Sequence, residues 1–489
     1  MHTTQKQRLD KKASTFQLIA PRNARICAGL SQSRKTPKMT KPASPSADSV
    51  SSLLGRIDDR SYVVGVVGLG YVGVPLALTA VKAGFTVLGF DIDADRAAQL
   101  SQGRSLIKHI SHEAIAEAVE TGRFSATAEF DRLGEPDAIL IAVPTPLTKY
   151  REPDLSYVEN TAQTITPHLR RGQLIVLEST TWPGTTREVI KPILETTGLT
   201  SGVDFYLAFS PEREDPGNEN FGAANTPKIV GGEGEDALRL ATALYGGFVE
   251  RTVPVSSTAT AEAVKLTENI FRSVNIALVN ELKTIYDAMG IDIWEVIDAA
   301  KTKPFGFMPF YPGPGLGGHC IPIDPFYLTW KAREFGILTK FIELAGEINT
   351  AMPAYVVARL AEALDKKSGR GLSGARILIL GVAYKKNIDD MRESPSLVLI
   401  ELLEKRGAKV EFHDPHIPVI PKTREHAALA GRRSQPLTPE TIAGYDAILI
   451  ATDHDAVDYA ALVNNARLVV DTRNACARTG AMRGNVVKA

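Results

Sequence analysis

The sequence repeats itself, and this repeat restricts the fold more than any other feature does. The hexapeptide Asp-Ala-Ile-Leu-Ile-Ala occurs at residues 137–142 and again, unchanged, at 446–451. In both places it follows a strand-like apolar run, a glycine, a helical segment and a second strand-like run that ends at an acid. These segments are 62–68, 74–83 and 86–90 before Asp91, and 376–380, 396–405 and 409–412 before Asp414. Strands that alternate with helices predict a parallel sheet with right-handed crossovers, so we expect one such α/β domain towards each end.

A long helical region is expected between the two repeats. Over residues 256–300, apolar side chains recur at spacings of three and four, which is the period of a helix with one apolar face; they are Ala263, Leu266, Ile270, Val274, Ala277 and Leu278. The sequence therefore predicts an α/β protein with two Rossmann-like doubly wound domains joined by a central helical domain. This arrangement leaves a cleft where two ligands could meet, and a linking helix of this kind often carries a dimer interface.

The charge of the chain is unevenly distributed. The 489 residues have a formal net charge of zero, which argues against a generally basic nucleic-acid-binding protein. Residues 1–38 hold nine basic residues and one acid, so they carry +8 and the rest carries −8. Residues 1–60 lack sustained periodicity, and we interpret them as a disordered basic tail or as an over-extended start upstream of Met39. Their scarcity of acids also matches a transit peptide, but no clear amphipathic helix emerges.

One uncharged stretch is long enough to cross a membrane. Residues 61–81 contain no charged side chain, and about 20 apolar residues suffice for a transmembrane helix. Four glycines and Pro75 lie inside this stretch, and they favour a strand, a turn and a helix in a soluble domain. The three cysteines are too few for a disulfide framework and suit a reducing compartment. We therefore predict a cytoplasmic protein that binds neither membrane nor nucleic acid.

The turn after the first strand carries a dinucleotide-binding pattern, Gly68-Leu-Gly70-Tyr71-Val72-Gly73. It follows a predicted strand, opens a helix and precedes Asp91, which is the context that this G-x-G-x-x-G pattern requires. Gly68 permits the tight turn, Gly70 lets the pyrophosphate approach the backbone, and Gly73 allows close packing of helix on strand. Asp91 would bind ribose hydroxyls and repel a 2′-phosphate, so we predict NAD rather than NADP. Arg96 weakens this preference, because a nearby arginine could hold a phosphate.

The second α/β domain lacks the triple glycine. Gly381 is followed by Val-Ala-Tyr and then by two lysines, Lys385 and Lys386. We therefore expect this domain to bind a different phosphate-bearing ligand, held mainly by cationic side chains. Lys385, Lys386 and Arg392 are the candidates, and a solvated charge cluster is the alternative.

A loop rich in glycine and proline, residues 312–320, ends at the candidate nucleophile Cys320. Such a loop is a fixed segment whose backbone can approach a ligand. A lone cysteine is more often a buried apolar residue than a nucleophile, but this placement, with His319 before it and Asp324 after it, favours a functional role. We expect no metal, because no second cysteine or histidine lies at ligand spacing.

Lys265 and Asn269 lie four residues apart on one face of the predicted central helix. An ordinary helix surface is the alternative, but this helix is fairly apolar and should face the cleft. There the lysine could stabilise an oxyanion, and the asparagine could orient a water molecule or the cysteine loop.

With these residues in view, the chain resembles the UDP-glucose/nucleotide-sugar 6-dehydrogenase family from about Val63 to Arg473. Seven blocks in order carry the resemblance: the glycine loop, Val143-Pro-Thr145-Pro, Glu178-Ser-Thr180, Ser210-Pro-Glu212, Lys265-Leu-Thr-Glu-Asn269, Gly317-Gly-His-Cys320-Ile-Pro-Ile-Asp324, and residues 384–395 around Arg392. The resemblance implies an NAD-binding Rossmann domain at 61–253, a central helical dimerisation domain at 254–365 and a UDP-binding Rossmann-like domain at 366–489. It also implies a homodimer or higher homo-oligomer.

The implied reaction oxidises a sugar C6 alcohol to a carboxylate with two NAD and one water, for surface polysaccharide precursor synthesis. Cys320 would capture the aldehyde as a thiohemiacetal, and a second hydride transfer would give a thioester that water hydrolyses. By the same resemblance, Lys265 stabilises oxyanions, and Asn269 and Asp324 act on the water, with Thr180 nearby. Glu212 matches an acid/base residue. The implied cofactor contacts are Thr145, Thr180 and Arg392, and the implied substrate contacts are Lys265, Asn269, Gly317 and Lys385.

The run from Lys301 to Cys320 is most similar to bacterial UDP-N-acetylglucosamine 6-dehydrogenases. His319 and Arg213 stand where enzymes for UDP-glucose more often carry other residues, so we predict a UDP-N-acetylhexosamine substrate, foremost UDP-N-acetylglucosamine. UDP-glucose, UDP-N-acetylmannosamine and UDP-N-acetylgalactosamine stay open. A two-electron hydroxyacid dehydrogenase and a non-catalytic regulator that binds NAD and nucleotide are the rival hypotheses.

Overall fold

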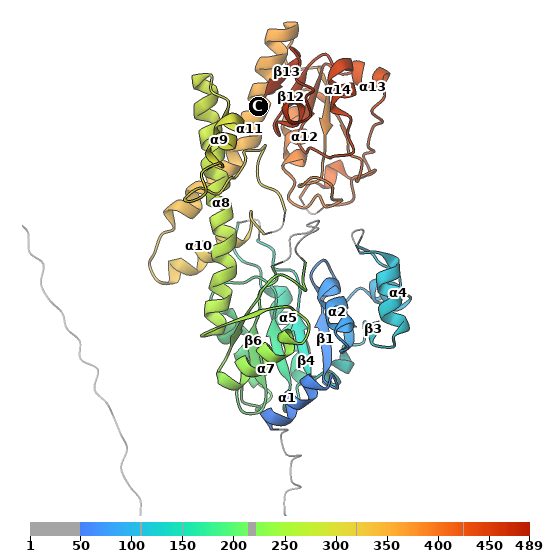
Figure 1. Ribbon diagram of the computed structural model, residues 1–489, viewed down its shortest axis with the longest axis vertical. Coiled ribbons are helices and arrows are strands. Elements are labelled where there is room, and N and C mark those ends of the chain that lie inside the picture. Colours follow the sequence, from blue (N-terminus) through green and yellow to red (C-terminus); the bar gives the residue numbers. More distant parts are fainter. Residues whose placement is uncertain (1–48, 108–109, 149, 214–221, 319, 424) are drawn as a thin grey trace, which may run out of the picture. The chain divides into compact units, whose positions relative to one another are not determined.

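The computed structural model describes residues 49–107, 110–148, 150–213, 222–318, 320–423 and 425–489 (Figure 1). Its first sheet has eight strands in the order β3-β2-β1-β4-β5-β6-β7-β8, and every neighbouring pair is parallel except β6 with β7. The strands are β1 (Val63–Val67), β2 (Thr86–Phe90), β3 (Phe124–Thr127), β4 (Ala138–Ile141), β5 (Leu174–Leu177), β6 (Tyr206–Phe209), β7 (Lys228–Gly232) and β8 (Thr252–Val255).

Both faces of this sheet are covered. Successive residues of a strand point to opposite faces, and Leu140 belongs to one apolar core whereas its neighbours Ile139 and Ile141 belong to another. Strands buried on two sides read as continuous apolar runs, which explains the composition of β4 and β5. The surrounding helices are α1 (Val50–Asp58), α2 (Gly73–Lys82), α3 (Ala94–Ser101), α4 (His112–Glu120), α5 (Ser156–Ile165), α6 (Lys191–Glu195) and α7 (Glu235–Gly246), with short turns η1 (Phe130–Gly134), η2 (Thr166–His168) and η3 (Thr186–Ile190).

Helix α1 corrects the expected extent of the tail. We predicted disorder throughout residues 1–60, but residues 50–58 form a helix whose N-cap is Ser49, which accepts a hydrogen bond from the Ser52 amide. Leu53 and Ile57 lie four residues apart on one helix face and are buried in the core of the first sheet, which accounts for the order of this segment. The prediction for residues 1–48 lies outside the described residues.

The uncharged stretch 61–81 forms β1, the glycine turn and most of α2, as expected for a strand–turn–helix unit. Within the described residues, no helix combines the length and the apolar composition needed to cross a membrane.

The central region is helical, as predicted. It consists of α8 (Thr258–Met289), α9 (Ile293–Ala300), α10 (Asp324–Glu334) and α11 (Lys340–Ser368). Helices α8 and α11 are joined by buried amides: Asn280 Nδ2 donates to Asn349 Oδ1 at 2.9 Å, and Asn349 Nδ2 donates to the Ser273 carbonyl at 3.1 Å. Because buried polar groups need partners, these two bonds fix how α11 lies against α8.

A second, fully parallel sheet has five strands in the order β10-β9-β11-β12-β13. The repeated hexapeptide contributes β4 to one sheet and β11 to the other, and each lies beside the first strand of its own repeat. The predicted fold class is therefore confirmed. The elements are β9 (Arg376–Leu380), β10 (Lys409–His413), β11 (Ala447–Ile450), β12 (Val469–Asp471) and β13 (Val486–Lys488), with α12 (Pro395–Lys405), η4 (Ala427–Leu429), α13 (Pro439–Ala443), α14 (Tyr459–Asn465) and α15 (Ala475–Arg478).

Candidate active site

The glycine turn lies at the carboxyl end of β1, between β2 and β4, where the strand order of the first sheet reverses. Ligands of doubly wound sheets bind at this point. Gly68 has φ 95°, and a Cβ there would come within 2.6 Å of the Ala142 carbonyl oxygen; a Cβ on Gly73 would overlap the Gly68 carbonyl oxygen. A Cβ on Gly70, by contrast, would have no atom within 4 Å, so the space beside this residue is open. Helix α2 begins at Gly73 without a side-chain cap. Open space beside an uncapped helix start fits a pyrophosphate.

Asp91 is buried directly after β2. Its Oδ2 accepts a hydrogen bond from the Leu69 amide at 2.9 Å, and its Oδ1 accepts one from the Asp93 amide at 3.0 Å. Arg96 Nη1 lies 3.4 Å from Asp91 Oδ2, so the structure pairs these two predicted cofactor residues with each other. The hydrogen bond from Leu69 holds the Asp91 carboxylate next to the glycine turn.

Three further residues predicted at the cofactor lie around this turn. Tyr71 is half-buried, and its ring centroid lies 4.6 Å from the Arg392 guanidinium carbon; Arg392 is in turn held by Asp390, with Nη2 at 2.6 Å from Oδ2. Val72 is the residue before α2. Thr145, just after β4, is buried, and the Tyr327 hydroxyl donates to the carbonyl of the next residue, Pro146, at 3.2 Å.

Cys320 lies just before α10 and keeps an exposed surface. Its carbonyl accepts a hydrogen bond from the Asp324 amide at 2.8 Å. Partial loss of water around the thiol and the nearby Asp324 carboxylate raise the pKa of Cys320, while Lys265 and Arg392 act in the opposite direction. The structure therefore brings the predicted nucleophile within electrostatic reach of residues from α8, α10 and the 384–395 segment.

Asp324 opens α10 and is almost completely buried. Asn269 Nδ2 donates to Asp324 Oδ2 at 2.6 Å. Burial raises the pKa of Asp324 to about 7, although Lys265 and the Asn269 hydrogen bond both lower it. A carboxyl group with a pKa near neutrality can take up and release a proton during turnover.

Lys265 is buried on α8, one turn before Asn269. Its Nζ donates a hydrogen bond to the backbone carbonyl of Glu212. This contact fixes the ammonium group at the carboxyl end of β6. The i, i+4 spacing thus places Lys265 and Asn269 on one buried face of α8, where Lys265 contacts the segment after β6 and Asn269 contacts α10.

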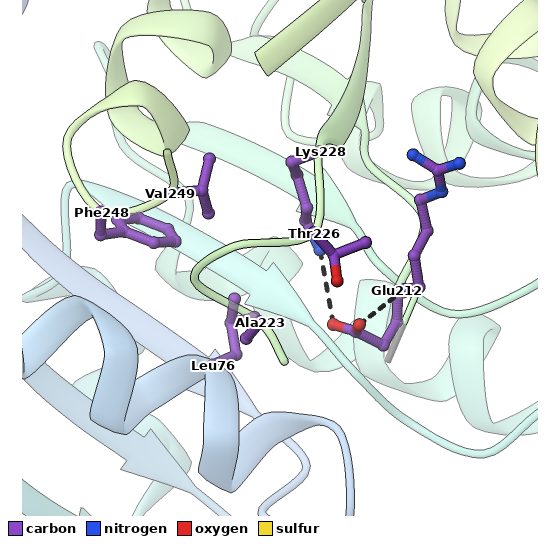
Figure 2. Close-up of a pocket in the computed structure, with 8 residues that line it drawn as sticks. Leu76, Glu212, Ala223, Thr226, Lys228, Phe248 and Val249 are labelled. Atoms are coloured by element: carbon purple, nitrogen blue, oxygen red, sulfur yellow. Dashed lines mark hydrogen bonds and ion pairs between the residues drawn. The ribbon is translucent and has the colours of Figure 1, made fainter. Parts of the chain in front are cut away.

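Sequence reasoning missed the buried charges around Glu212; Figure 2 shows one of their contacts, between Glu212 and Lys228. Lys228 Nζ, at the start of β7, lies 2.6 Å from Glu178 Oε2 and 3.5 Å from Glu212 Oε2, and the Tyr245 hydroxyl donates to Glu178. Burial alone would lower the pKa of Lys228, but Glu178 and Glu212 outweigh it and raise that pKa. Burial raises the pKa of Glu178, and the positive charge of Lys228 makes this rise smaller. A lysine opening an apolar strand was the only signal in the sequence.

Gly317 lies where the cysteine loop touches the segment after β9. A Cβ on Gly317 would come 2.6 Å from Tyr384 Cβ, and the Gly318 amide donates to the Arg392 carbonyl at 3.1 Å. Of the two neighbouring lysines, Lys385 is half-buried. Lys386 pairs with Asp455 at 3.2 Å, so it is bound to the protein's own carboxylate.

Thr180 follows β5 by three residues and is half-buried. The role implied for Thr180 in positioning water stays a prediction. His319 lies outside the described residues. Among the residues that the structure does describe, no group of three His, Cys, Asp or Glu side chains is placed to hold a metal ion.

Comparison with protein families gives three matches in the order of the fold. Residues 62–249 match the NAD binding domain of the UDP-glucose/GDP-mannose dehydrogenase family, 259–351 match its central domain, and 378–478 match its UDP binding domain. The family resemblance predicted from the sequence is thereby confirmed.

Individual relatives agree with the family match. A UDP-N-acetyl-D-mannosamine dehydrogenase of Pyrococcus horikoshii is 36% identical over 84% of this chain and 95% of its own length. A UDP-N-acetyl-D-glucosamine 6-dehydrogenase of Pseudomonas aeruginosa is 36% identical over 81% of this chain and 91% of its own length. Among solved structures, a UDP-D-ManNAc dehydrogenase from Pyrococcus horikoshii superposes with a TM-score of 0.77 at 35% identity, covering 87% of this chain and 97% of that one.

Proposed function

Because the chain belongs to the UDP-glucose/GDP-mannose dehydrogenase family, we propose that it oxidises the C6 alcohol of UDP-N-acetylglucosamine to the carboxylate. At the coarser level it is an NAD-dependent nucleotide-sugar dehydrogenase of the kind that acts on UDP-N-acetyl sugars. The observation that carries the oxidation to the acid is the position of Cys320: its carbonyl binds the amide of the buried Asp324, and the charges of Lys265 and Arg392 act on its thiol. An oxidation that stops at the aldehyde needs no cysteine, whereas a nucleophilic cysteine can carry the aldehyde to the acid through a thioester.

NAD fits the first sheet. The open position at Gly70 and the uncapped start of α2 would hold the pyrophosphate, and Asp91 would accept hydrogen bonds from the ribose hydroxyls. When bound, NAD supplies the hydride acceptor for both oxidations. Arg96 supports this assignment over NADP, because its ion pair with Asp91 engages the arginine that could otherwise hold a 2′-phosphate.

The first half of the reaction takes the alcohol to a covalent adduct. The C6 alcohol loses a hydride and a proton, and the resulting aldehyde accepts the Cys320 sulfur at C6. The C–S bond forms as the carbonyl π bond breaks, and the oxygen becomes an oxyanion before it is protonated. Lys265 is held by the Glu212 carbonyl, where its ammonium group would stabilise this oxyanion.

The second half takes the adduct to the acid. The thiohemiacetal loses a second hydride and a proton, which leaves a thioester on Cys320. Water then adds to the thioester carbonyl, the C–S bond breaks, and the carboxylate leaves while the thiol is restored. Asp324, with its pKa near 7 and its bond to Asn269, would take the proton from that water. Glu212 and Thr180 are the further proposed acid/base and water-positioning residues.

The N-acetyl sugar preference is supported by the cysteine loop sequence and by Arg213. Arg213 forms a two-point ion pair with Glu268 on α8, with Nη2 at 2.5 Å from Oε1, and donates to the Pro227 carbonyl at 2.6 Å. This arginine is therefore anchored beside Glu212. Gly317 and Lys385 are the proposed contacts of the UDP moiety.

A panel of UDP-sugars tests the substrate. UDP-N-acetylglucosamine, UDP-N-acetylmannosamine, UDP-N-acetylgalactosamine and UDP-glucose are each incubated with NAD or NADP, and reduced cofactor is counted against uronate formed. The proposal predicts the highest kcat/KM for UDP-N-acetylglucosamine with NAD and two NADH per uronate. A higher kcat/KM for an epimer overturns the sugar assignment, and one NADH per turnover favours a two-electron dehydrogenase.

We also propose that the enzyme is a homodimer formed along α8 and that it works in the cytoplasm. Phe271, Leu278, Ile285 and Met289 are large apolar residues of α8 that are between 41% and 65% exposed. Their spacings of seven, seven and four residues place them on one helix face, and a second copy of the chain would cover that face.

The proposed location in the cytoplasm rests on the cysteines. The free thiols of Cys320 and Cys476 suit a reducing compartment, and fractionation of the source cells tests the location.

A further inference from the structure

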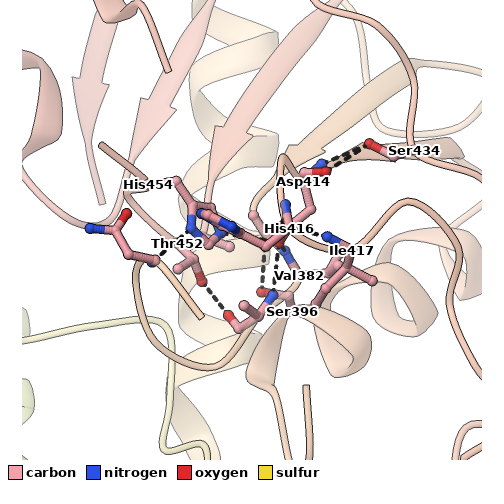
Figure 3. A network of polar contacts seen from close by, with 12 residues as sticks. Val382, Ser396, Asp414, His416, Ile417, Ser434, Thr452 and His454 are labelled. Carbon is pink, nitrogen blue, oxygen red and sulfur yellow. Dashed lines mark hydrogen bonds and ion pairs between the residues drawn. The ribbon is translucent and has the colours of Figure 1, made fainter. Parts of the chain in front are cut away.

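The second sheet uses the acid at the end of its second strand differently from the first sheet. Asp414 follows β10 as Asp91 follows β2. Its Oδ2 accepts hydrogen bonds from the amides of Val382 and Ala383 at 2.7 and 3.0 Å. Its Oδ1 accepts from the amides of His416 and Ile417 at 2.8 and 3.1 Å (Figure 3). Asp414 thus accepts two backbone hydrogen bonds on each oxygen, whereas Asp91 accepts one on each, so Asp414 has fewer acceptor positions left for a ribose.

His454 completes the environment of Asp414. The imidazole is fully buried, and its Nε2 lies 3.1 Å from Asp414 Oδ2. Burial works against ionisation of Asp414, but the hydrogen bonds from His454 and the backbone amides outweigh it and lower the pKa of Asp414. An ionised carboxylate only accepts hydrogen bonds, so His454 must carry a proton on Nε2.

The other ring nitrogen of His454 holds the segment that follows β9. The Asn387 amide donates to His454 Nδ1 at 3.0 Å. Because an amide N–H can only donate, Nδ1 must be unprotonated, and both bonds are satisfied at once only by the neutral imidazole with its proton on Nε2. A second proton, on Nδ1, would point at the N–H of the Asn387 amide, and the hydrogen bond between them would be lost.

Asn387 sits in the middle of a loop, residues 384–392, that the active site uses at both ends. Its φ is 62°, and its side chain exchanges two hydrogen bonds with Asp455, the residue after His454. On one side of Asn387 the loop carries Lys385, and at its end the Arg392 carbonyl accepts from Gly318 while the Arg392 guanidinium lies over Tyr71. Asp390 holds Arg392 through both its backbone amide and its guanidinium, so displacing Asn387 would displace the Lys385 part of the loop and leave Arg392 in place.

We propose that His454 is a positioning residue for UDP-sugar binding, and that its neutral form holds the 384–392 loop in the binding conformation. The inference rests on the proposed function for the identity of the ligand. Protonation of His454 would release Asn387 and weaken binding of the UDP moiety, while leaving the glycine turn of the first sheet unchanged. The titratable and charged groups around His454 are Asp414, His413, His416, Asp455, Lys386 and Tyr459.

The test compares three variants of the full-length enzyme with wild type by calorimetric titration with UDP alone, between pH 8 and pH 5.5. His454→Gln keeps a donor for Asp414 but cannot be protonated, and His454→Phe can make neither bond. His416→Gln is the matched control, because the His416 ring lies against His454 with centroids 4.9 Å apart, and the substitution keeps the backbone amide that binds Asp414.

We expect wild type and His416→Gln to lose UDP affinity by at least about fivefold as the pH falls, the size of one hydrogen bond. His454→Gln should bind UDP as wild type does at pH 8 and show no such loss. His454→Phe should bind UDP more weakly at every pH and raise the KM for the UDP-sugar while kcat and the Kd for NAD change less than about twofold.

Two results overturn the proposal: an unchanged pH dependence in His454→Gln, or equal weakening of UDP and NAD binding in His454→Phe. Because UDP binding is measured without turnover, a wrong assignment of the sugar or of the chemistry leaves this test intact. If His454→Phe does not fold, the comparison of wild type with His454→Gln still decides the question.

Discussion

Asn269 donates a hydrogen bond to a carboxylate that has almost no contact with solvent: its Nδ2 lies 2.6 Å from Asp324 Oδ2. Burial raises the pKa of Asp324, and this bond together with Lys265 limits the rise, so that the pKa settles at about 7. The balance between the two effects keeps Asp324 able to exchange a proton at neutral pH. The bond therefore links α8 and α10 at the carboxyl group that we propose to activate water.

The first prediction follows from the direction in which that hydrogen bond shifts the pKa of Asp324, which is downwards. If ionised Asp324 activates water, kcat rises as the pH increases through about 7. Asn269→Ala removes a group that lowers the pKa of Asp324, so the rising limb should move to higher pH. The measurement is a steady-state pH profile of kcat at saturating NAD and UDP-sugar. A limb that stays in place, or moves to lower pH, would show that Asp324 is not the titrating group.

The second prediction concerns stability. The folded-state pKa of Asp324, about 7, exceeds its ordinary value of 3.8, so the stability that depends on the protonated form is present below about pH 4 and is lost as the pH rises through 7. Asp324→Asn removes this loss but keeps an acceptor for Asn269. We expect the variant to be more stable than wild type at pH 8.5, by on the order of 2–4 kcal/mol, and equal to it near pH 4, as measured by thermal denaturation. A variant less stable at pH 8.5 would contradict the account.

The third prediction concerns Lys228 and its two carboxylate partners, a contact that could not be predicted from the sequence. Lys228→Met leaves Glu178 and Glu212 without their shared cation, and a buried carboxylate without its partner costs about 3–5 kcal/mol. We therefore expect a lower Tm and a lower kcat, since Glu212 loses the charge that holds it. Lys228→Arg, which retains the charge, is the control and should keep more of both. Unchanged stability in Lys228→Met would remove this network from the account.

The fourth prediction concerns assembly. Leu278 lies in the exposed apolar stripe of α8 and is 50% exposed, so Leu278→Glu would place a charge in the proposed dimer interface and should give monomers in light scattering after size-exclusion chromatography. Val203, which is 67% exposed on the first domain, provides the control Val203→Glu. A dimer that survives Leu278→Glu and dissociates with Val203→Glu would place the interface elsewhere.

The strands and long helices could be predicted because their apolar periods are local. The runs 86–90 and 376–380 form β2 and β9 with the predicted bounds, and Lys265 and Asn269 share the buried helix face that their spacing implied. Helix α1 was missed because Leu53 and Ile57 stand among serines and gain their order only by packing on a sheet formed later in the chain.

The partners of buried charges could not be predicted. Lys228 and Glu178 are 50 residues apart in sequence, and nothing local indicates that β7 and the end of β5, which β6 separates in the sheet, place them side by side in a fully buried position. The same holds for His454, which finds Asp414 across 40 residues. Sequence patterns identify which faces are apolar, but which charges meet there depends on strand order and register.

Cofactor counting against uronate formation by Cys320→Ser tests the central claim, that Cys320 carries the sugar through the second oxidation. Wild type should release two NADH for each uronate. Cys320→Ser should bind UDP and NAD normally but form no uronate and at most one NADH per aldehyde produced, because without the thiol no thioester can form. Uronate formed by Cys320→Ser with two NADH per product would contradict the account.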